Sequence, residues 1–507
     1  MEYGLSLCLQ MPINTNNKIL HQLTILYIYI PVVIFLFGWC NIFVAGITLL
    51  GILYTLVRID RDPEYMNAGE NIKIPPVMLI VAFLAITALL VIMGVGGIFP
   101  QPGDYAKHNA VLRDLVTHSW PVYYEEAEKS MLTYYLGQYL LPALAGKTYG
   151  GFDTANAFML LWAVCGVLLV FLNLVRVSGA VQHSQKIAAF VMMFFFSGAL
   201  PICQVLLSLI LKDGFFSLLN YHWVLTSEAM LQYRSNTVML RWVFPQVIVA
   251  WLVAELMYEG RIKEKYFCFF IIPVALFGAF SFASLCVAAI ILAIVDLIIK
   301  RCSIKDIFSS YNIISALTLG MVIAIYLWGN VSLVKPVSSS LRIRSYHGRE
   351  IWTYICFTVV MVGIYLLCIF MENRKNALYY ITAFILFVVP FLRMGLFNDI
   401  VMSATIPILF WLMLMILRFM FKCKSNGMAK GVIIAMVCIG MIYPLAELAD
   451  NINANEKGMN FEDSYYSMES YSDRGNDELQ EDMKYNYFSY EPDSNVFVRF
   501  LAKRQSP

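Results

Sequence analysis

The sequence predicts an all-α polytopic membrane protein, and three observations support that prediction. The chain has 507 residues, of which 60% are hydrophobic and 14% are charged, whereas about one quarter of the residues in a soluble globular protein are charged. The mean hydropathy is +0.69. Apolar runs of spanning length recur along most of the chain. This composition excludes a soluble enzyme, a disordered protein and a nucleic-acid-binding protein with a basic face, so the lipid bilayer is the first expected partner.

Thirteen segments are apolar enough to cross a bilayer as helices, since a span needs roughly 20 apolar residues. Two pairs of these segments, over 19–57 and 266–299, have almost no connecting loop. Each pair is therefore either a hairpin or one long tilted helix. No apolar region is followed by a small-residue cleavage site, so the first helix is expected to be an uncleaved signal anchor. The predicted spans are 19–38, 39–57, 76–98, 154–176, 186–211, 242–258, 266–281, 283–299, 312–330, 351–371, 376–392, 404–421 and 430–446.

Lysine and arginine determine the predicted orientation, because both are enriched in cytoplasmic loops. One set of short loops is dense in these residues, as at Arg261, Lys263 and Lys265, and is placed in the cytoplasm. The N-terminus is then cytoplasmic and the C-terminus extracytoplasmic. The absence of cysteine from the external loops and of a retention signal favours a bacterial plasma (inner) membrane. The alternating, less basic loops are placed outside and cover 99–153, 212–241, 331–349 and 393–403.

Three parts are expected along the chain. Residues 1–75 form a transmembrane hairpin and a cytoplasmic loop, residues 76–450 form the transmembrane core, and residues 451–507 form an external acidic tail. The tail carries eleven acidic residues against six basic ones and has no apolar run, so its middle is expected to be flexible. None of the eleven cysteines lies in the long external loops or the tail, and no CxxC pair occurs. Neither a disulfide framework nor a thiolate metal site is expected.

The first external loop contains the most specific candidate, Asp104. It follows a turn rich in Gly and Pro at 96–103 and begins a predicted amphipathic helix over 104–118. This position places an acid at the mouth of the membrane. Asp104 and His108 are four residues apart and share a helix face, so they can ligate a divalent cation such as Mg or Mn. Asp114 and His118 have the same spacing. Solvated charges on a surface helix are the alternative interpretation, and they account better for His118 and Arg113.

Further along this loop, a second short helix is expected over 133–146, either re-entrant or interfacial. Tyr134 and Tyr135 at its start are candidates to stack on a sugar face, although aromatic residues at a membrane interface usually serve as anchors. Lys107, on the first helix, is a candidate substrate-binding cation beside Asp104.

The remaining external loops add cations and one acid. Arg234 and Arg241 lie near the start of a predicted helix, where they suit a phosphate group, while snorkelling to the interface is the alternative. Arg342 and Arg344 lie in the most cationic external loop. They are candidates to contact a phosphate group as well, and the alternative is that both are solvated. Asp399 begins another helix, where it either belongs to the site or caps that helix.

Several common motifs are absent. The sequence has no P-loop, no GxSxG nucleophile motif, no HExxH metal motif and no GxGxxG dinucleotide motif. Hydrolysis of a cytosolic nucleotide is therefore not expected. No internal repeat is evident, which argues against an inverted-repeat transporter.

The layout of the chain resembles the GT-C superfamily of polytopic glycosyltransferases, which take sugars from polyprenyl-phosphate carriers on the extracytoplasmic or lumenal face. The shared features are many spans, a long first external loop with an acid near its start, and interfacial helices in that loop. Three segments are also similar to uncharacterised bacterial membrane proteins of this type: GDYAKH at 103–108, YRSNT at 233–237 with WVFPQ at 242–246, and FNDIVMSATIP at 397–407. Only Asp104 corresponds to the acid of the superfamily. An extra helical pair precedes its loop, a large soluble C-terminal domain is absent, and no second acid follows at 105, so metal dependence stays open.

The resemblance implies sugar transfer from a polyprenyl-phosphate carrier to an envelope glycan, lipid or protein acceptor, with inversion at the anomeric carbon. Asp104 is then the general base, and Arg234, Arg241, Arg342 or Arg344 stabilise the leaving phosphate. His108 or Asp399 orients the base or the acceptor. Three alternatives stay open: a transporter or flippase, a polymerase or ligase of lipid-linked saccharides, and a non-catalytic assembly protein.

Overall fold

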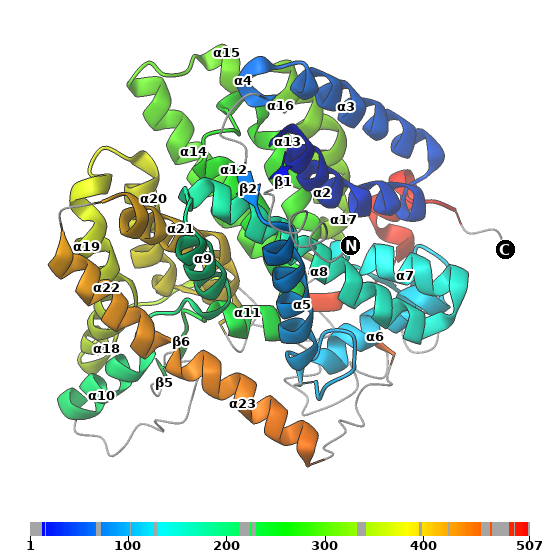
Figure 1. The fold of residues 1–507 in the computed structure, drawn as a ribbon. Helices are drawn as coiled ribbons and strands as arrows, with labels where there is room; N and C mark the ends of the chain where they lie inside the picture. Colours follow the sequence, from blue (N-terminus) through cyan, green and yellow to red (C-terminus); the bar gives the residue numbers. More distant parts are fainter. Residues whose placement is uncertain are drawn as a thin grey trace, which may run out of the picture.

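A computed structural model covers the whole chain, and it describes residues 13–15, 17–66, 72–101, 103–124, 129–211, 224–225, 230–331, 341–394, 398–423, 426–457, 467–468, 486–490 and 492–504. Most of the second external loop and the middle of the tail lie outside the described residues. Within them, helices predominate and the strands are short (Figure 1). The prediction of an all-α multi-pass membrane protein is confirmed at this level.

Eight helical segments among the described residues are long and apolar enough to cross a membrane. A ninth span results if α9 (His183–Phe195) and α10 (Leu200–Leu211), which meet at 49°, are counted together. The eight are α2 (Asn17–Trp39), α3 (Ile42–Asp60), α8 (Gly151–Ser178), α14 (Ala279–Ile298), the run Ile304–Gly329, the run Arg349–Asn373, α21 (Asp399–Lys422) and the run Gly427–Glu456.

The other predicted spans are helical but shorter. Pro76–Ile92 (α5), Phe244–Tyr258 (α12) and Ala377–Phe391 fall short of the length of the eight. Over 266–281, the chain forms a short helix and a 3-10 turn before α14 starts, because Pro273 supplies no backbone N–H and Gly278 is extended. The count of thirteen spans therefore stays a prediction.

The remaining short elements complete the architecture. They are β1 (Ile13–Thr15), α4 (Pro63–Met66), β2 (Ile72–Ile74), α6 (Asp104–Thr117), β3 (Tyr123–Tyr124), β4 (Ser130–Leu132), α7 (Gly137–Tyr149), β5 (Val224–Leu225), β6 (Met230–Leu231), α11 (Asn236–Trp242), η1 (Glu264–Tyr266), α13 (Phe267–Ile271), η2 (Ile272–Leu276), α15 (Ile304–Ile307), α16 (Ser310–Ser315), η3 (Ala316–Gly320), α17 (Met321–Val331), β7 (Arg342–Ile343), α18 (Arg349–Thr358), η5 (Val359–Gly363), α19 (Ile364–Asn373), α20 (Ala377–Val388), η6 (Val389–Phe391), β8 (Leu392–Arg393), α22 (Gly427–Gly440), α23 (Ile442–Glu456), β9 (Phe488–Tyr490), η8 (Pro492–Ser494) and η9 (Phe497–Leu501).

The first predicted pair, 19–57, is a hairpin of two separate helices. The chain turns at Cys40 and Asn41, and the Asn41 side chain accepts a hydrogen bond from the Val44 N–H at 3.0 Å. This capping bond starts α3 and stabilises the helix by about 1 kcal/mol.

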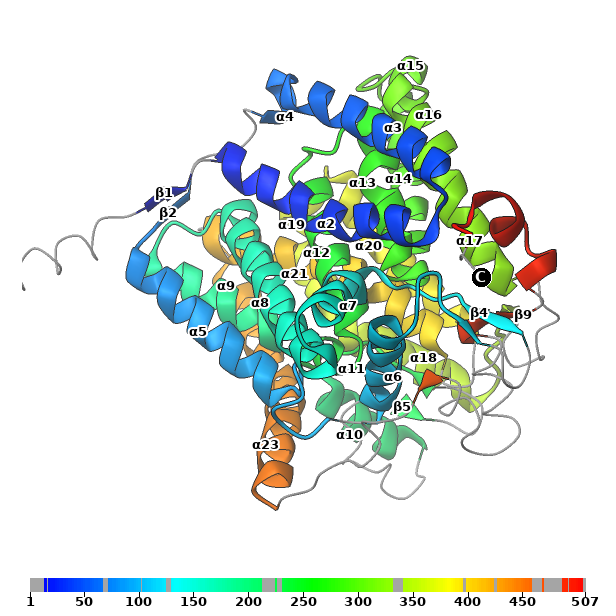
Figure 2. The same ribbon diagram turned by 90° about the vertical axis from the view of Figure 1, so that its right-hand side faces the viewer.

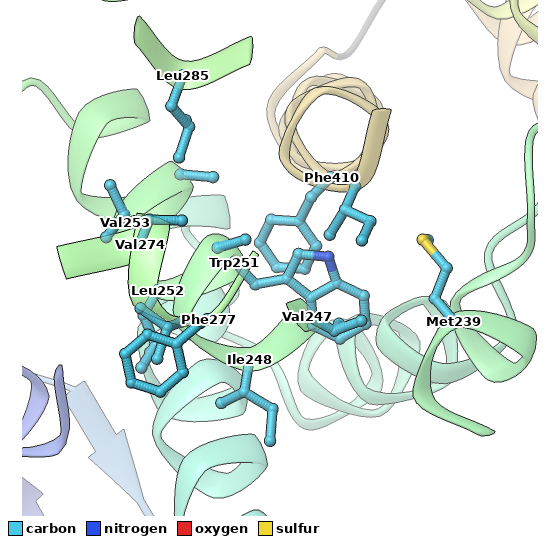
Figure 3. Packing of buried hydrophobic residues seen from close by; sticks show 14 of the residues in the cluster. Met239, Val247, Ile248, Trp251, Leu252, Val253, Val274, Phe277, Leu285 and Phe410 are labelled. Carbon is cyan, nitrogen blue, oxygen red and sulfur yellow. The ribbon is translucent and has the colours of Figure 1, made fainter. Parts of the chain in front are cut away.

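Helices α12 and α21 form the centre of the bundle. All of the spanning window of α21 is buried, as expected for a helix that is apolar all round and enclosed by others. Trp251 of α12 stacks on Phe410 of α21 with ring centroids 4.9 Å apart (Figure 3). The indole N–H of Trp411 donates to the Ala254 carbonyl at 2.7 Å, which fixes the two helices against each other.

The C-terminal segment folds back on the first predicted external loop. Strand β9 pairs antiparallel with β4, which also pairs with β3. The following turn η9 packs against α17, and the Lys503 N–H donates to the Trp39 carbonyl at 2.8 Å. Figure 2 shows this segment, in red, beside α17 and the β4–β9 pair. The tail, the α2–α3 turn and the first loop therefore share one end of the bundle.

Candidate functional site

Helix α6 positions Asp104. The preceding turn contains Gly94, Gly96 and Gly97, all at positive φ, which residues with a Cβ rarely adopt. The Gln101 side chain fixes this turn to the helix: its amide N–H donates to the Gly94 carbonyl at 2.8 Å, and its oxygen accepts from Asn109 at 2.6 Å. Asp104 lies half-buried in the first turn of α6.

The predicted surface helix 104–118 is present as α6, but most of it is covered by protein. It packs on α7 and α8, and its apolar residues Val111, Leu112 and Leu115 are buried. Asp114 is buried as well. Its carboxylate accepts from the Tyr124 hydroxyl at 2.6 Å and from the Met468 N–H at 2.8 Å, which ties the tail to the loop.

His108 is enclosed, with both ring nitrogens bonded. Nε2 lies 3.0 Å from the Trp242 carbonyl, which can only accept, so Nε2 carries the proton. Nδ1 then accepts from the Tyr139 hydroxyl at 2.5 Å. Burial lowers the pKa of His108 to about 4, so the ring is neutral at physiological pH. The predicted role of His108 as a metal ligand stays a prediction, and it would require the ring to give up one of these bonds.

Tyr134 and Tyr135 lie side by side, with ring centroids 3.6 Å apart. The Tyr326 hydroxyl lies 3.1 Å from the Tyr134 N–H and 3.0 Å from its carbonyl, which fixes this part of the backbone. The Gln246 amide donates to the Tyr135 hydroxyl at 2.9 Å. Burial raises the pKa of Tyr135. The charge of Lys107 opposes this rise, and the carboxylates of Asp399 and Asp104 add to it.

Arg234 precedes α11, and a neutral amide orients it. The side-chain oxygen of Gln232 accepts from Arg234 Nε at 2.9 Å and from Nη2 at 2.7 Å. The Gln232 amide in turn donates to the Asn398 carbonyl at 3.2 Å, so the arginine is attached to the loop that leads to Asp399. Burial lowers the pKa of Arg234 to about 10, and the negative charges of Asp104 and Asp399 partly oppose this fall. The guanidinium therefore remains charged at neutral pH.

Asp399 occupies the exposed first position of α21. The preceding Asn398 is left-handed (φ 53°) and makes no capping bond to the helix. Instead its side chain bridges two loops: the amide donates to the Met230 carbonyl, and the oxygen accepts from the Met394 N–H, both at 3.3 Å. This bridge holds the start of α21 beside the strand that leads to Arg234.

Arg241 is a structural clamp in this structure. Its guanidinium donates to the Glu447 carboxylate at 2.7 Å and to the Asn451 side chain at 2.9 Å. The Trp242 indole donates to the same carboxylate at 2.9 Å. The ion pair joins α11 to α23, which continues to Glu456, beyond the predicted start of the tail. The predicted contact of Arg241 with a substrate phosphate stays a prediction, since the described bonds of Arg241 serve this clamp.

Arg342 and Arg344 lie on or beside a two-stranded ribbon, β7–β8. Arg342 is exposed and in register with Arg393. The Arg344 N–H donates to the Phe391 carbonyl at 2.7 Å, and its guanidinium lies 5.9 Å from the centre of the Tyr346 ring. The ribbon brings both arginines to the loop that leads into α21.

Two of the predicted residues feel the charges of others: those of Lys107, Asp399 and Asp104 act on Tyr135, and those of Asp104 and Asp399 act on Arg234. Sequence reasoning missed the roles of three residues. Gln232 orients Arg234, Gln246 donates to Tyr135, and Glu447 neutralises Arg241. The available signal for Glu447 was an acid directly after a predicted apolar span.

A small pocket, with room for about one water molecule, lies between α6, α7, α8 and α12. Its polar lining consists of Tyr105, His108, Asn109, Tyr139 and the neighbouring amides of Gln101 and Asn156. In the part of the chain that the structure describes, no three His, Cys, Asp or Glu side chains gather to hold a metal ion. The ten described cysteines are free thiols.

Comparisons of this chain with protein-family models, with curated proteins and with solved structures found no match.

Proposed function

We propose that this chain is a membrane glycosyltransferase that moves a sugar from a polyprenyl-phosphate carrier to an envelope glycan, lipid or protein acceptor. The observation that supports the proposal is that Asp104 shares the start of α6 with one cation, Lys107, and acts electrostatically on a second, Arg234. A carboxylate and fixed cations are the groups that displacement of a phosphate from a sugar requires. The apolar helices suit the lipid tail of the carrier.

Asp104 is the proposed general base. It lies half-buried on the first turn of α6, and the hydrogen-bonded turn before it fixes its backbone. It takes the proton from the acceptor hydroxyl as that oxygen attacks the anomeric carbon. The bond to the carrier phosphate breaks at the same time, and the electron pair leaves with the phosphate.

Arg234 and Lys107 are proposed to stabilise the leaving phosphate. Two N–H groups of Arg234 donate to the side-chain oxygen of Gln232. The planar guanidinium of Arg234 is therefore oriented before the substrate binds. Tyr135, which accepts a hydrogen bond from Gln246, is proposed to contact the sugar. His108 is a buried, neutral residue of α6. Its proposed role is to hold this helix in place through its bonds to Tyr139 and Trp242.

Transport of a lipid-linked saccharide is a second candidate, and the break between α9 and α10 favours it. Discontinuous helices form substrate sites in several transporter folds. Here, however, side chains of α11 bond the carbonyls near the break: Thr237 donates to Phe194 at 2.7 Å, and the Asn236 amide donates to Met193 at 3.0 Å. Those bonds make the break part of a fixed scaffold.

The test compares the wild type with Asp104→Asn in membranes, after both are shown to insert equally. The readouts are loss of polyprenyl-phosphate sugar and labelling of envelope glycan. We expect transfer to fall by about 10²–10⁴-fold, the usual contribution of a general base. The matched control is Asp153→Asn, an exposed acid in the first turn of α8, which should transfer normally. Normal transfer by Asp104→Asn would remove the proposed mechanism and favour transport.

A further inference from the structure

The opposite end of the bundle contains a buried polar network. Arg176, at the far end of α8, pairs with Glu259 at 2.9 Å, and Arg261 bonds the same carboxylate oxygen at 2.5 Å. Arg176 also donates to Asn173 at 2.8 Å and to His21 Nε2 at 2.8 Å. These side chains come from α2, α8 and the end of α12, so the network joins three segments.

Glu255 lies one turn deeper than Glu259 on the same face of α12. Its side chain is completely buried, and neither carboxyl oxygen has a hydrogen-bond partner. The charges that act on it are those of Arg176 and Glu259. A buried carboxylate without hydrogen bonds costs several kcal/mol, so this arrangement requires either a proton on Glu255 or a polar ligand beside it.

Three donors in the same network lack acceptors. Arg176 can only donate, so His21 Nε2 accepts and the ring proton is on Nδ1. That Nδ1–H has no partner, and neither do Arg176 Nε–H and the Tyr65 hydroxyl. The Tyr65 and His21 rings are 5.5 Å apart. Three orphan donors and an orphan carboxyl in one buried network are the pattern that bound water satisfies.

The network is separate from the candidate site. Asn156, which lines the small pocket, and Arg176 both belong to α8. At 1.5 Å per residue the helix separates them by roughly 30 Å, about the thickness of the hydrocarbon core. Glu255 lies one turn inside the end of α12 and is completely buried, and an ionisable residue buried among the apolar helices of a membrane protein usually serves a function.

We propose that Glu255, with Arg176, His21 and Tyr65, forms a hydrated proton-exchange site at the end of the bundle opposite Asp104. Its ligands are bound water and a proton. Water bridges the orphan donors to the carboxyl group, and a proton passes from that water to Glu255 and back. His21 cannot serve as the proton acceptor without losing its bond from Arg176, so Glu255 is the exchanging group. Arg261 and Glu259, which are bonded to each other, close the network at the helix ends. This inference does not depend on the proposed sugar transfer.

Infrared spectroscopy of the full chain in lipid nanodiscs tests the site, with D₂O as the probe. We expect a carbonyl band of a protonated carboxylic acid that grows as the pH falls and shifts promptly in D₂O. Glu255→Gln should lose the component of the band that belongs to Glu255, seen as a difference from the wild type at the same pH. The control Glu372→Gln, an exposed acid at the end of α19, should keep it. Glu255→Asp retains an acid and should move the band, which covers the case in which Glu255→Gln does not fold.

Two outcomes would overturn the proposal. If the wild type and Glu255→Gln give the same carbonyl band at every pH, Glu255 stays ionised and exchanges no proton. If the band is present but insensitive to D₂O, the site is dry and water does not bridge the donors. Neither outcome bears on Asp104, so the sugar-transfer proposal is tested separately.

Discussion

Two arginines at the two ends of α11 show how the partner decides the role of a buried cation. Arg241, in the last turn, meets the Glu447 carboxylate at 2.7 Å and joins α11 to α23. Arg234, just before the helix, donates to the side-chain oxygen of Gln232, and the charges of Asp104 and Asp399 also act on it. The carboxylate of Glu447 makes Arg241 a structural clamp between two helices, whereas the amide of Gln232 orients the guanidinium of Arg234.

The largest expected effect comes from breaking the clamp. Glu447→Ala leaves Arg241 buried without its carboxylate, which should lower the free energy of unfolding by about 3–5 kcal/mol. Thermal unfolding in detergent, followed by circular dichroism, measures the loss. The double variant Arg241→Met with Glu447→Leu removes both charges and should recover most of the stability. A single variant as stable as the wild type would contradict the clamp.

The stability of the region around Arg241 should depend on pH, because the ring of His108 bonds the carbonyl of the neighbouring Trp242. The pKa of His108 is about 4 in the folded protein, below the ordinary 6.5 that applies in the unfolded chain. The unfolded chain therefore binds the proton more readily. This contribution to stability is complete above pH 6.5 and decreases as the pH falls toward 4, by up to about 3 kcal/mol.

Denaturation over that pH range measures the slope in the wild type and in His108→Gln, which should lose this part of the pH dependence. The matched control is His118→Gln, at the half-buried end of the same helix, which should keep it. If the two variants have the same slope, His108 does not titrate as its burial implies.

Arg234 should show the reverse pattern, with a loss of activity rather than of stability. Arg234→Ala is expected to reduce sugar transfer by about 10²–10³-fold, the usual loss when one oriented donor to a developing negative charge is removed. Arg234→Lys should restore only part of the rate, since an ammonium lacks the planar geometry that Gln232 orients. Transfer assays in membranes, beside thermal unfolding, separate the two effects. If Arg234→Ala is less stable but transfers sugar at the normal rate per folded molecule, Arg234 is structural, like Arg241.

Much of this contrast lies beyond sequence reasoning. Apolar periodicity predicted the helices, because burial in lipid or protein needs continuous apolar length. It could not distinguish a span from a shorter buried helix such as α12, since both are apolar over most of their length. The amphipathic pattern over 104–118 predicted α6, but not its burial under α7 and α8. The identity of each arginine's partner depends on long-range packing, and Glu447 lies more than two hundred residues after Arg241.

The smallest effect is expected at Arg342, which shares the charge of Arg234 but lies exposed on the β7–β8 ribbon. An exposed cation interacts through solvent and is screened beyond a Debye length of about 8 Å at physiological salt. Arg342→Ala should therefore change transfer by less than about threefold, and raising the salt concentration should remove even that difference. The defect of Arg234→Ala should persist in high salt, because a partly buried, oriented cation is screened much less. If Arg342→Ala and Arg234→Ala lose the same amount of sugar transfer in high salt, the ribbon closes onto the substrate. The contrast between buried and exposed cations would then fail.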